Sequence, residues 1–579
     1  MPLKNLLTPW GEQITDRPLQ EYPRPQFRRN SYVNLNGFWQ YAITKTAEEP
    51  SLYDGRILVP FSPESCLSGV NRQLKPNEYL WYCCEFTLPA GFIKDLVLLH
   101  FGAVDSICDV YVNGRHVCHH EGGYNAFSAD ITACLNENAP IRLVVKVRDF
   151  TDTRYYTNGK QSTHRKGMWY TPQSGIWQTV WLESVPEQYV KSVRITPDFV
   201  NATVTVQAEC TFDEPFTIIV YDGDVEVCKA DGKNSVTAHF PDGNFKAWSP
   251  ESPFLYNLKI ISRRDKVDSY FAMRKFSMEK VDGSLRLMLN NKPYFHNGLL
   301  DQGYYSDGLY TPPSDEAMVY DIATMKYLGF NMLRKHIKVE PMRWYYHCDR
   351  LGMLVWQDMP SGGTKQNKFV TLYLPFIGKT KLKDDNYKRF SRKSVESRET
   401  YMREYDEMLT QLYNCPCIAT WVPFNEGWGQ FDANLVAEYT KKADPTRFVD
   451  HASGWHDQGG GDFQSLHVYF KKVHFKKDDN RATVLSEFGG YSYKDMSHSF
   501  NPDATYSYKI FPDKQSFNQG LKELYERDVI AKIPKGLSAT VYTQVTDVED
   551  EVNGLLTYDR RVMKVDADLM REINSKVKI

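Results

Sequence analysis

Two glutamates in this sequence stand at the ends of apolar, strand-like runs. Glu426 closes "IATWVPFNE", and Glu487 lies in "TVLSEFGG". Two carboxyl groups that face each other across a sugar can cleave a glycosidic bond, one as proton donor and the other as nucleophile. A glutamate of this kind on its own is more often a salt-bridge partner or a helix cap. The chemistry therefore depends on a fold that brings the two together.

The C-terminal half of the chain has the pattern of such a fold. From residue 293 onward, short apolar runs alternate with segments of helical periodicity, the first of which begins after a potential N-cap at Ser314. Eight strands alternating with helices over about 300 residues are typical of a (β/α)8 barrel. The predicted strands lie in residues 293–300, 329–336, 353–358, 418–426, 447–455, 463–469, 483–490 and 539–547.

In a (β/α)8 barrel the catalytic groups lie at the carboxyl ends of the strands. Glu426 follows the fourth predicted strand and Glu487 the seventh, on opposite sides of the ring, so both should point into one mouth. Most of the other strand ends also carry a polar or aromatic side chain. Together with Trp428, the residues predicted to contact substrate are Asp301, Arg334, His336, Asn425, Trp455, His467, Tyr469, Gln544 and Asp547.

The surroundings of the two glutamates predict different roles. Glu426 lies among tryptophan and phenylalanine residues, and the loss of water there should raise its pKa and favour the protonated acid. Arg334 and the Tyr469 hydroxyl could hold Glu487 ionised as the nucleophile. A separation of about 5 to 5.5 Å would give retention of configuration. Asn425 could donate a hydrogen bond to a sugar hydroxyl next to the anomeric carbon.

The N-terminal half reads as β-structure in two parts. Residues 1–185 contain short strand-like runs separated by turn clusters, and residues 186–280 contain about seven more, enough for a small β-sandwich. We therefore predict three domains, with limits at 1–185, 186–280 and 281–579.

Net charge, apolar runs and aromatic content limit the classes of partner that the protein can bind. The net charge is −2, so no basic field favours nucleic acid or an anionic membrane, and no apolar run is long enough for a membrane span. Aromatic residues make up 14% of the chain, which suits contact with sugars as well as a β-rich core. The N-terminus lacks an apolar signal region, which predicts a cytoplasmic protein. The oligomeric state is open, and a homo-oligomer is compatible with the sequence.

Neither a disulfide framework nor a metal site is expected. The eleven cysteines are an odd number and match no disulfide or zinc spacing, so reduced thiols are the simplest interpretation. His116, Cys118 and His120 alternate along one predicted strand and would share a face. Zinc sites are rarely built from one strand, so we predict no metal ligands and no cofactor.

The order of several motifs resembles glycoside hydrolase family 2 over nearly the whole chain. The motifs are "LNGFWQY", "VYVNG" and "SGIWQTVWLE" in the first part and "NMLRKH", "WYYHCDRLGMLVWQDMP", "NEG" and "SEFGG" in the last. The resemblance implies a jelly-roll sugar-binding domain, an immunoglobulin-like sandwich and a TIM barrel. It also implies that Glu426 is the acid/base and Glu487 the nucleophile. Further residues implied to contact substrate or orient the nucleophile are Asn425, Arg334, Tyr469, His336 and His467.

Two stretches depart from the motifs of the family, and both concern the specificity for the sugar. Family members that cleave galactosides carry Asn-Arg-His-Glu where this chain has "GLLDQG", and members that cleave glucuronides carry Asn-x-Lys where it has "EDEVNG". Glu551 in the latter stretch would repel a uronic acid. The acidic cluster Asp547, Glu549 and Glu551 either binds neutral-sugar hydroxyls or forms a solvated loop.

The resemblance leads to an exo-acting, retaining glycoside hydrolase, with a β-galactosidase-like activity as first expectation. Specificity for β-mannosides, β-galacturonides or α-L-arabinofuranosides stays open, as does a non-catalytic carbohydrate-binding protein on the same scaffold. Two long insertions, 364–393 and 491–520, follow the third and seventh predicted strands, and we expect them to form walls of the substrate site.

Overall fold

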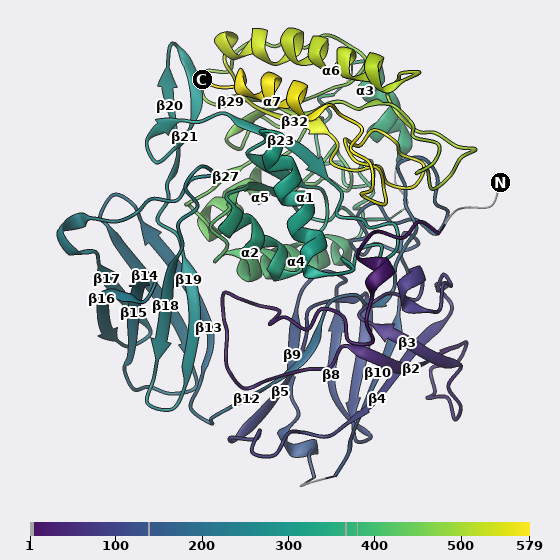
Figure 1. The fold of residues 1–579 in the computed structure, drawn as a ribbon, viewed down its shortest axis with the longest axis vertical. Coiled ribbons are helices and arrows are strands. Elements are labelled where there is room, and N and C mark those ends of the chain that lie inside the picture. The colour runs from purple at the N-terminus through teal and green to yellow at the C-terminus, as the bar shows by residue number, and fades with distance from the viewer. Residues whose placement is uncertain (1–4, 137–138, 365–366, 379) are drawn as a thin grey trace.

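A computed structural model of the chain describes residues 5–136, 139–364, 367–378 and 380–579. Figure 1 shows two β-rich domains side by side beneath a larger unit that contains the long helices. The three-domain architecture predicted from the sequence is confirmed. The predicted limits at 185 and 280 fall between two sandwiches and inside strand β20 (Phe276–Val281).

The first domain is an antiparallel sandwich whose inward faces form one apolar core. Valine-rich strands alternate buried and partly exposed residues, as half-buried strands do. The larger sheet has the order β3 (Gly55–Val59), β2 (Gly37–Thr44), β4 (Tyr79–Phe86), β10 (Ile141–Arg148), β7 (Ile107–Val112) and β8 (Arg115–Glu121). The smaller sheets join β1 (Tyr32–Asn34), β12 (Val180–Val185), β5 (Leu96–Phe101) and β9 (Phe127–Asp130), and β11 (Gly175–Ile176) with β6 (Val104–Asp105).

The second domain is a seven-stranded sandwich with its own core. One sheet contains β13 (Val190–Asp198), β14 (Thr203–Cys210) and β17 (Ser235–His239). The other contains β16 (Val225–Gly232), β15 (Phe216–Asp222), β18 (Tyr256–Ile261) and β19 (Lys266–Phe271). A three-stranded sheet of β20, β21 (Ser284–Leu289) and β22 (Lys292–Pro293) then leads into the barrel.

Eight parallel strands form the barrel, at the eight places predicted. The sheet runs from β27 (Phe448–Val449) through β26 (Ile418–Val422), β25 (Leu354–Asp358), β24 (Met332–Lys335), β23 (His296–Asp301), β32 (Leu537–Thr543) and β29 (Ala482–Gly489) to β28 (Phe463–Val468). Because both faces of these strands are covered, they read as continuous apolar runs.

The helices follow the prediction only in part. Ser314 accepts a hydrogen bond from the Ala317 N–H and so caps the first helix, as expected. The regular alternation fails after the fifth and sixth strands, because residues 450–462 and 469–481 form no helix. The α-helices are α1 (Asp315–Tyr327), α2 (Met342–Leu351), α3 (Leu374–Phe376), α4 (Val395–Leu412), α5 (Ala433–Ala443), α6 (Lys514–Asp528) and α7 (Ala567–Ser575).

The two insertions contain little regular structure. The first holds the π-helix η5 (Phe369–Tyr373) and α3, and its residues 365–366 and 379 lie outside the described part of the chain. The second holds β30 (Tyr491–Ser492) and β31 (Lys509–Ile510) and runs into α6, so its last seven residues are helical rather than loop. The 3₁₀-helices are η1 (Gly11–Gln13), η2 (Cys66–Ser68), η3 (Thr132–Cys134), η4 (Pro241–Gly243) and η6 (Ile530–Lys535).

The first domain packs directly onto the barrel. Tyr170 and Trp177 belong to the same apolar cluster as the barrel strands, and the Thr311 hydroxyl donates to the Trp177 carbonyl. The N–H groups of Asn158 and Gly159 both donate to the Ser361 carbonyl, just beyond β25. Residues 156–170 are therefore held against the end of the barrel where the strand-end side chains lie.

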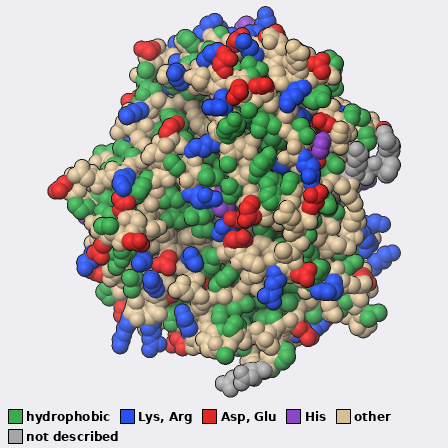
Figure 2. Space-filling view, viewed as in Figure 1, with side chains coloured by type: hydrophobic (Ala, Val, Ile, Leu, Met, Phe, Trp, Pro, Cys, Tyr) green, Lys and Arg blue, Asp and Glu red, His purple; other side chains and the backbone are tan. Residues whose placement is uncertain are grey.

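The distribution of surface charge and the state of the cysteines agree with the composition of the sequence. Figure 2 shows basic and acidic side chains interspersed over the visible face, without a large patch of one sign. All eleven cysteines are free. Within the described residues, helices that could cross a membrane are absent.

Candidate active site

Glu426 follows the fourth barrel strand and lies in a sharp turn of the backbone. Its φ is +52°, and those of Gly427 and Gly429 are +71° and +65°. A Cβ on Gly427 would lie 2.6 Å from His456 Cδ2, so the turn requires glycine there. The Glu426 N–H donates to the Ser453 carbonyl at 3.0 Å, beyond the fifth strand. The "NEGWG" pattern thus directs the Glu426 carboxyl group into the barrel mouth.

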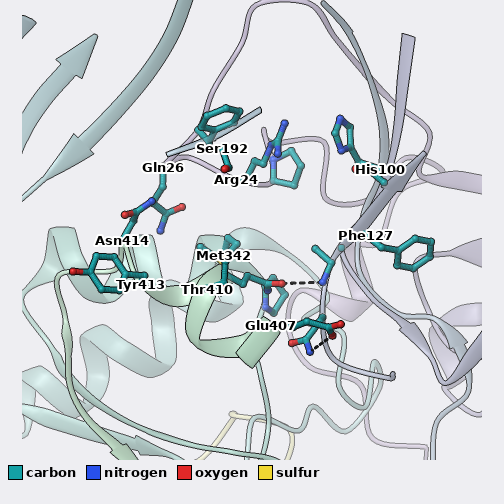
Figure 3. Close-up of a pocket in the computed structure, with 18 of the residues that line it drawn as sticks. Arg24, Gln26, His100, Phe127, Ser192, Met342, Glu407, Thr410, Tyr413 and Asn414 are labelled. Carbon is teal, nitrogen blue, oxygen red and sulfur yellow. Dashed lines mark hydrogen bonds between the residues drawn. The ribbon is translucent and has the colours of Figure 1, made fainter. Parts of the chain in front are cut away.

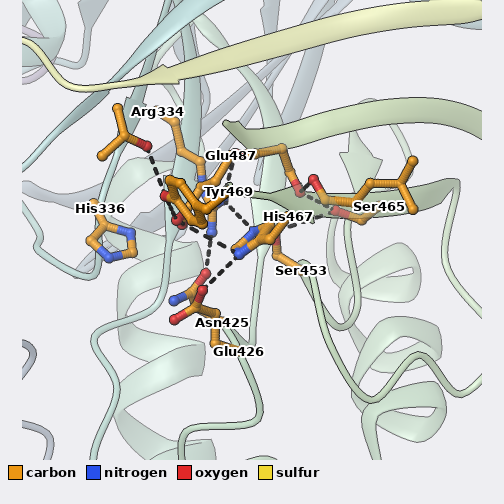
Figure 4. A network of polar contacts seen from close by, with 12 residues as sticks. Arg334, His336, Asn425, Glu426, Ser453, Ser465, His467, Tyr469 and Glu487 are labelled. Carbon is orange, nitrogen blue, oxygen red and sulfur yellow. Dashed lines mark hydrogen bonds and ion pairs between the residues drawn. The ribbon is translucent and has the colours of Figure 1, made fainter. Parts of the chain in front are cut away.

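Glu487 lies within the seventh strand, near its carboxyl end. It is opposite His467 in the register of β28 and β29, and glycines 489 and 490 follow it in left-handed conformation. One oxygen of Glu487, one oxygen of Glu426 and a ring nitrogen of His467 lie within 4.8 Å of one another. The structure therefore brings the two predicted glutamates together (Figure 4).

Arg334 connects four strand ends around the glutamates. Its guanidinium is fully buried and pairs with both oxygens of Asp358, at 2.9 and 3.1 Å. It also donates to Asn425 Oδ1 at 2.8 Å and to Glu487 Oε1 at 3.3 Å. A planar guanidinium held on several sides fixes the positions of the groups that it contacts.

Tyr469 holds the other oxygen of Glu487. Its hydroxyl lies 2.6 Å from Glu487 Oε2 and 2.9 Å from Thr543 Oγ1. Its ring is stacked on Tyr508 with centroids 3.8 Å apart. Both oxygens of Glu487 therefore have donors of fixed direction, as the sequence predicted for Arg334 and Tyr469.

His467 lies between the two carboxyl groups. Nδ1 is 2.9 Å from Glu426 Oε1 and 3.6 Å from Glu487 Oε2. Nε2 faces Arg334 Nη1 at 3.4 Å and the Ser453 hydroxyl at 3.2 Å. Because a guanidinium nitrogen can only donate, Nε2 must present its lone pair, and the ring proton is on Nδ1. His467 therefore donates a hydrogen bond toward the glutamates.

The pKa values of the two glutamates move in opposite directions. Burial raises the pKa of Glu426, and the charge of Glu487 raises it further, against the opposing effects of His467 and Lys160. Burial alone would also raise the pKa of Glu487, but the neighbouring His467, the charge of Arg334 and the hydrogen bond from Tyr469 hold that pKa below its ordinary value. A carboxylic acid and a carboxylate thus stand side by side, which is the arrangement that acid/base work requires.

His336 also joins the network, through Asp358. Its Nδ1 lies 2.9 Å from Asp358 Oδ2, and burial lowers its pKa well below the ordinary value. The ring is therefore neutral, and it lies beside Trp428, with centroids 6.5 Å apart.

Three predicted substrate contacts carry donors without partners. Asn425 Nδ2, Trp428 Nε1 and Gln544 Nε2 are buried and have no hydrogen-bond partner among the described residues. The oxygen of Gln544 is already bound by Gln302 Nε2 at 2.7 Å. Unsatisfied buried donors are uncommon in folded proteins and are costly unless a ligand or water meets them.

An apolar wall stands beside the glutamates. Trp428 packs with Met168 and Ile337, and Trp169 lies against it with ring centroids 5.1 Å apart. Leu372 of the first insertion and Tyr506 of the second contact the same cluster. Trp455, at the rim, lies 6.0 Å from the His467 ring. Both insertions therefore reach this wall.

Asp301 and Asp547 do not join the network. The oxygens of Asp301 accept from Lys335 Nζ at 2.7 Å and from the Gly303 N–H at 2.9 Å. Asp547 Oδ1 accepts from Lys564 Nζ at 2.6 Å and from the Gly554 N–H at 2.8 Å. These contacts hold loops in place, and neither carboxylate makes a described hydrogen bond to Glu426 or Glu487. Their role in substrate binding stays a prediction.

The acidic loop after the eighth strand is not solvated, which corrects one of the two sequence-based interpretations. Glu549 and Glu551 are 2% and 1% exposed. Glu549 accepts from the Thr171 N–H at 3.0 Å, and Glu551 accepts from the Tyr170 hydroxyl and from Asn553 Nδ2. The loop is instead the surface on which residues 160–171 of the first domain rest.

Sequence reasoning missed two contributors to the site, Tyr508 and Lys160. Tyr508 stacks on Tyr469, and the charge of Lys160 acts on Glu426 and His336. The first lies in an insertion without periodicity. The second comes from another domain, and no local pattern in the sequence reveals a contact across so many residues.

Three residues of the site are of types that bind metal ions. Glu426, His467 and Glu487 are the one set of three such residues in the described chain close enough to hold an ion. A protonated Glu426 is a poor ligand. His116 pairs with Asp109 at 3.2 Å, and His120 stacks on Phe127, while a bulge interrupts their strand between His116 and Cys118. His116 and His120, predicted to share one face with Cys118, thus have separate partners.

A second hollow lies where the three domains meet. It has a volume of about 1150 Å³ and is bounded by the N-terminal segment, both sandwiches and helices α2 and α4 (Figure 3). Arg24, His100 and Ser192 face Met342 and Tyr413 across it. Neither glutamate is among the described residues that line it.

The chain is similar to a known β-galactosidase, a β-D-glucuronidase and a β-galacturonidase. A β-galactosidase of Thermoanaerobacter pseudethanolicus is 22% identical over 495 residues, 80% of this chain and 62% of that protein. The chain thus spans less than two thirds of this relative's length. The structure of a β-D-glucuronidase of Dictyoglomus thermophilum is 18% identical with a TM-score of 0.74, covering 96% of this chain and 98% of the other. A β-galacturonidase of Eisenbergiella tayi is 17% identical with a TM-score of 0.68, over 97% and 99%.

Family models match all three domains in order. The sugar binding domain of glycosyl hydrolases family 2 matches residues 69–186, a second domain of the family matches 188–274, and its TIM barrel domain matches 284–490. These three segments follow one another along the chain as the three folded units do. The chain therefore belongs to glycosyl hydrolases family 2.

Proposed function

We propose that this protein is an exo-acting, retaining glycoside hydrolase that releases a terminal sugar, with a β-galactosidase-like activity as the first candidate. The observation that supports the proposal best is the pair Glu426 and Glu487, whose nearest oxygens are within 4.8 Å. Retaining enzymes have carboxyl groups about 5 to 5.5 Å apart, whereas inverting enzymes leave about 6.5 to 9.5 Å for a water molecule.

In the first step, Glu487 attacks the anomeric carbon while Glu426 gives its proton to the departing glycosidic oxygen. The glycosidic bond breaks as the sugar forms an ester with Glu487. In the second step, Glu426 takes a proton from water, and the resulting hydroxide attacks the anomeric carbon and frees Glu487. The reaction moves protons and a glycosyl group, so it needs no redox cofactor.

His467 would serve both steps. Only one of the two carboxyl groups is negative at each stage, first Glu487 and then Glu426. An Nδ1 proton 2.9 Å from one and 3.6 Å from the other can stabilise whichever carries the charge. Asn425, whose oxygen is held by Arg334, keeps Nδ2 available for a sugar hydroxyl.

A panel of p-nitrophenyl glycosides that differ only in the sugar tests the proposal. The wild-type protein should hydrolyse at least one of them, and Glu426→Gln and Glu487→Gln should each lose most of that activity. Absence of turnover on the whole panel, or full activity in both variants, would contradict the proposal. Binding of sugars without turnover would favour the non-catalytic carbohydrate-binding alternative.

A further inference from the structure

Lys160 belongs to the first domain but lies at the barrel mouth. Its neighbour Gly159 has φ +58°, and a Cβ there would lie 2.8 Å from the Ile337 carbonyl oxygen. The Lys160 carbonyl accepts from the Tyr170 N–H at 3.0 Å. These contacts fix the backbone on both sides of Lys160, so the position of its Cα atom is defined.

The ammonium group of Lys160 is poorly satisfied. The residue is 6% exposed, and Nζ makes no hydrogen bond to any residue that the structure describes. Glu551 Oε2, at 4.0 Å, is the one carboxylate oxygen of the described chain within ion-pair distance. The other described contact of the ammonium is the face of the Tyr170 ring, whose centroid lies 5.6 Å from Nζ. An ammonium has three protons to donate, so a ligand that supplies an oxygen atom would find free donors there.

The pair lies at the end of the barrel that holds the reacting groups. The N–H groups of Asn158 and Gly159 donate to the Ser361 carbonyl just beyond the third strand, and the charge of Lys160 acts on the pKa values of Glu426 and His336. Glu551, the ion partner of Lys160, lies in the loop after the eighth strand. Lys160 and Glu551 therefore lie at the end of the barrel where Glu426 and Glu487 also lie.

We propose that Lys160 and Glu551 together bind one hydroxyl group of the sugar that is released, and that this pair selects neutral sugars over uronic acids. The inference rests on the proposed glycosidase function. A hydroxyl group can accept from an ammonium and donate to a carboxylate at the same time, whereas a carboxylate ligand can only accept. The pair is thus suited to a hydroxyl.

The surrounding charges support a neutral ligand. Two nearby cations are already paired, Arg165 with Asp550 at 3.0 Å and Lys564 with Asp547 at 2.6 Å. A uronic acid would place another negative charge beside Glu551. Glu551 keeps acceptor capacity, since its oxygens each accept one described hydrogen bond and a carboxylate offers about four sites.

The test compares Lys160→Met with Lys166→Met on the glycoside that the wild type hydrolyses best. Lys166 lies in the same segment but is exposed, so it is a matched control. Loss of a hydrogen bond from a charged group should lower kcat/KM about 10- to 100-fold in Lys160→Met. Lys166→Met should stay close to wild type. Thermal melting of both variants checks that they fold equally.

A series of monodeoxy p-nitrophenyl glycosides identifies the hydroxyl without relying on any variant. On the wild type, removal of one particular hydroxyl should cost about the same factor as Lys160→Met. On that deoxy substrate the Lys160→Met and wild-type proteins should then be equal. An unchanged penalty for Lys160→Met on every deoxy substrate would overturn the inference.

Two further outcomes separate this inference from the proposed function. Equal activity of Lys160→Met and Lys166→Met on a hydrolysed substrate would overturn the role of Lys160 and leave the glycosidase proposal standing. A wild type that prefers p-nitrophenyl uronides over every neutral glycoside would overturn the selection of neutral sugars. Hydrolysis of no glycoside at all would instead contradict the function on which the inference rests.

Discussion

Two buried groups of carboxylates lie at the same end of the barrel, and they are built differently. Around Glu426 and Glu487, the basic partners Arg334 and His467 contact the acids, and three neighbouring donors have no described partner. In the acidic loop at 547–551, Lys564, Arg165 and Thr171 meet the carboxylates directly.

The difference shows what separates a reactive carboxylate from a structural one. Both groups are buried, and burial raises the pKa of Glu426 as it raises that of Asp547, to about 6 in the latter. Near the glutamate pair, however, the buried donors of Asn425, Trp428 and Gln544 have no described partner. In the acidic loop, the partners come from the protein itself and fix one domain upon another.

The largest expected effect is on Glu426→Gln. Removing the acid should lower kcat about 100- to 10,000-fold for a sugar leaving group, because the oxygen then departs without a proton. For a dinitrophenyl glycoside, whose leaving group needs little protonation, the first step should remain fast and the glycosyl-enzyme should accumulate. Steady-state and burst kinetics with both substrates measure this. Equal losses for both leaving groups would show that Glu426 is not the acid.

A substitution in the acidic loop should lower the free energy of unfolding rather than kcat. Asp547→Asn leaves the buried Lys564 ammonium without its counter-charge, which should cost about 3 kcal/mol of the free energy of unfolding. Denaturant unfolding measures the loss, and kcat at low temperature should stay within a few fold of wild type. A kcat loss comparable to that of Glu426→Gln, with unchanged stability, would erase the distinction between the two groups.

The smallest effect is a shift of the pH profile. An Nδ1 proton that stabilises the anions of both glutamates lowers both pKa values, so His467→Met should raise both. Activity requires ionised Glu487 and protonated Glu426, and both limbs of the kcat/KM profile should therefore move to higher pH. His467→Gln, which keeps an N–H donor, should restore part of the shift. A reduced rate with unmoved limbs would indicate only a packing role for His467.

Features that depend on residues close together in the sequence could be predicted from it. The eight barrel strands are continuous apolar runs, and Ser314 caps the helix that its position predicts. The glutamate pair followed from strand order, and the partners Arg334 and Tyr469 from strand ends. The helices missing after the fifth and sixth strands were not predictable, because short polar segments there can close the turn without one.

Contacts between domains could not be predicted from the sequence. The solvated loop, one of the two alternatives for Glu551, followed from the rule that charged runs usually face water. Glu551 is buried by Tyr170, which lies 381 positions earlier in the chain. Asp301 was predicted to contact substrate because it ends a strand, and the structure adds an ion pair with Lys335 of the next strand. A strand-end position does not reveal whether a neighbour has already engaged the side chain.

The most direct test of the central claim is the covalent trapping of Glu487. A 2-deoxy-2-fluoro glycoside with a dinitrophenyl leaving group slows the second step, so the glycosyl-enzyme should persist. Intact-protein mass spectrometry should show one added fluoroglycosyl group, and peptide mapping should place it on Glu487. A label on another residue, or rapid hydrolysis of an accepted substrate to the inverted sugar without any label, would contradict the account.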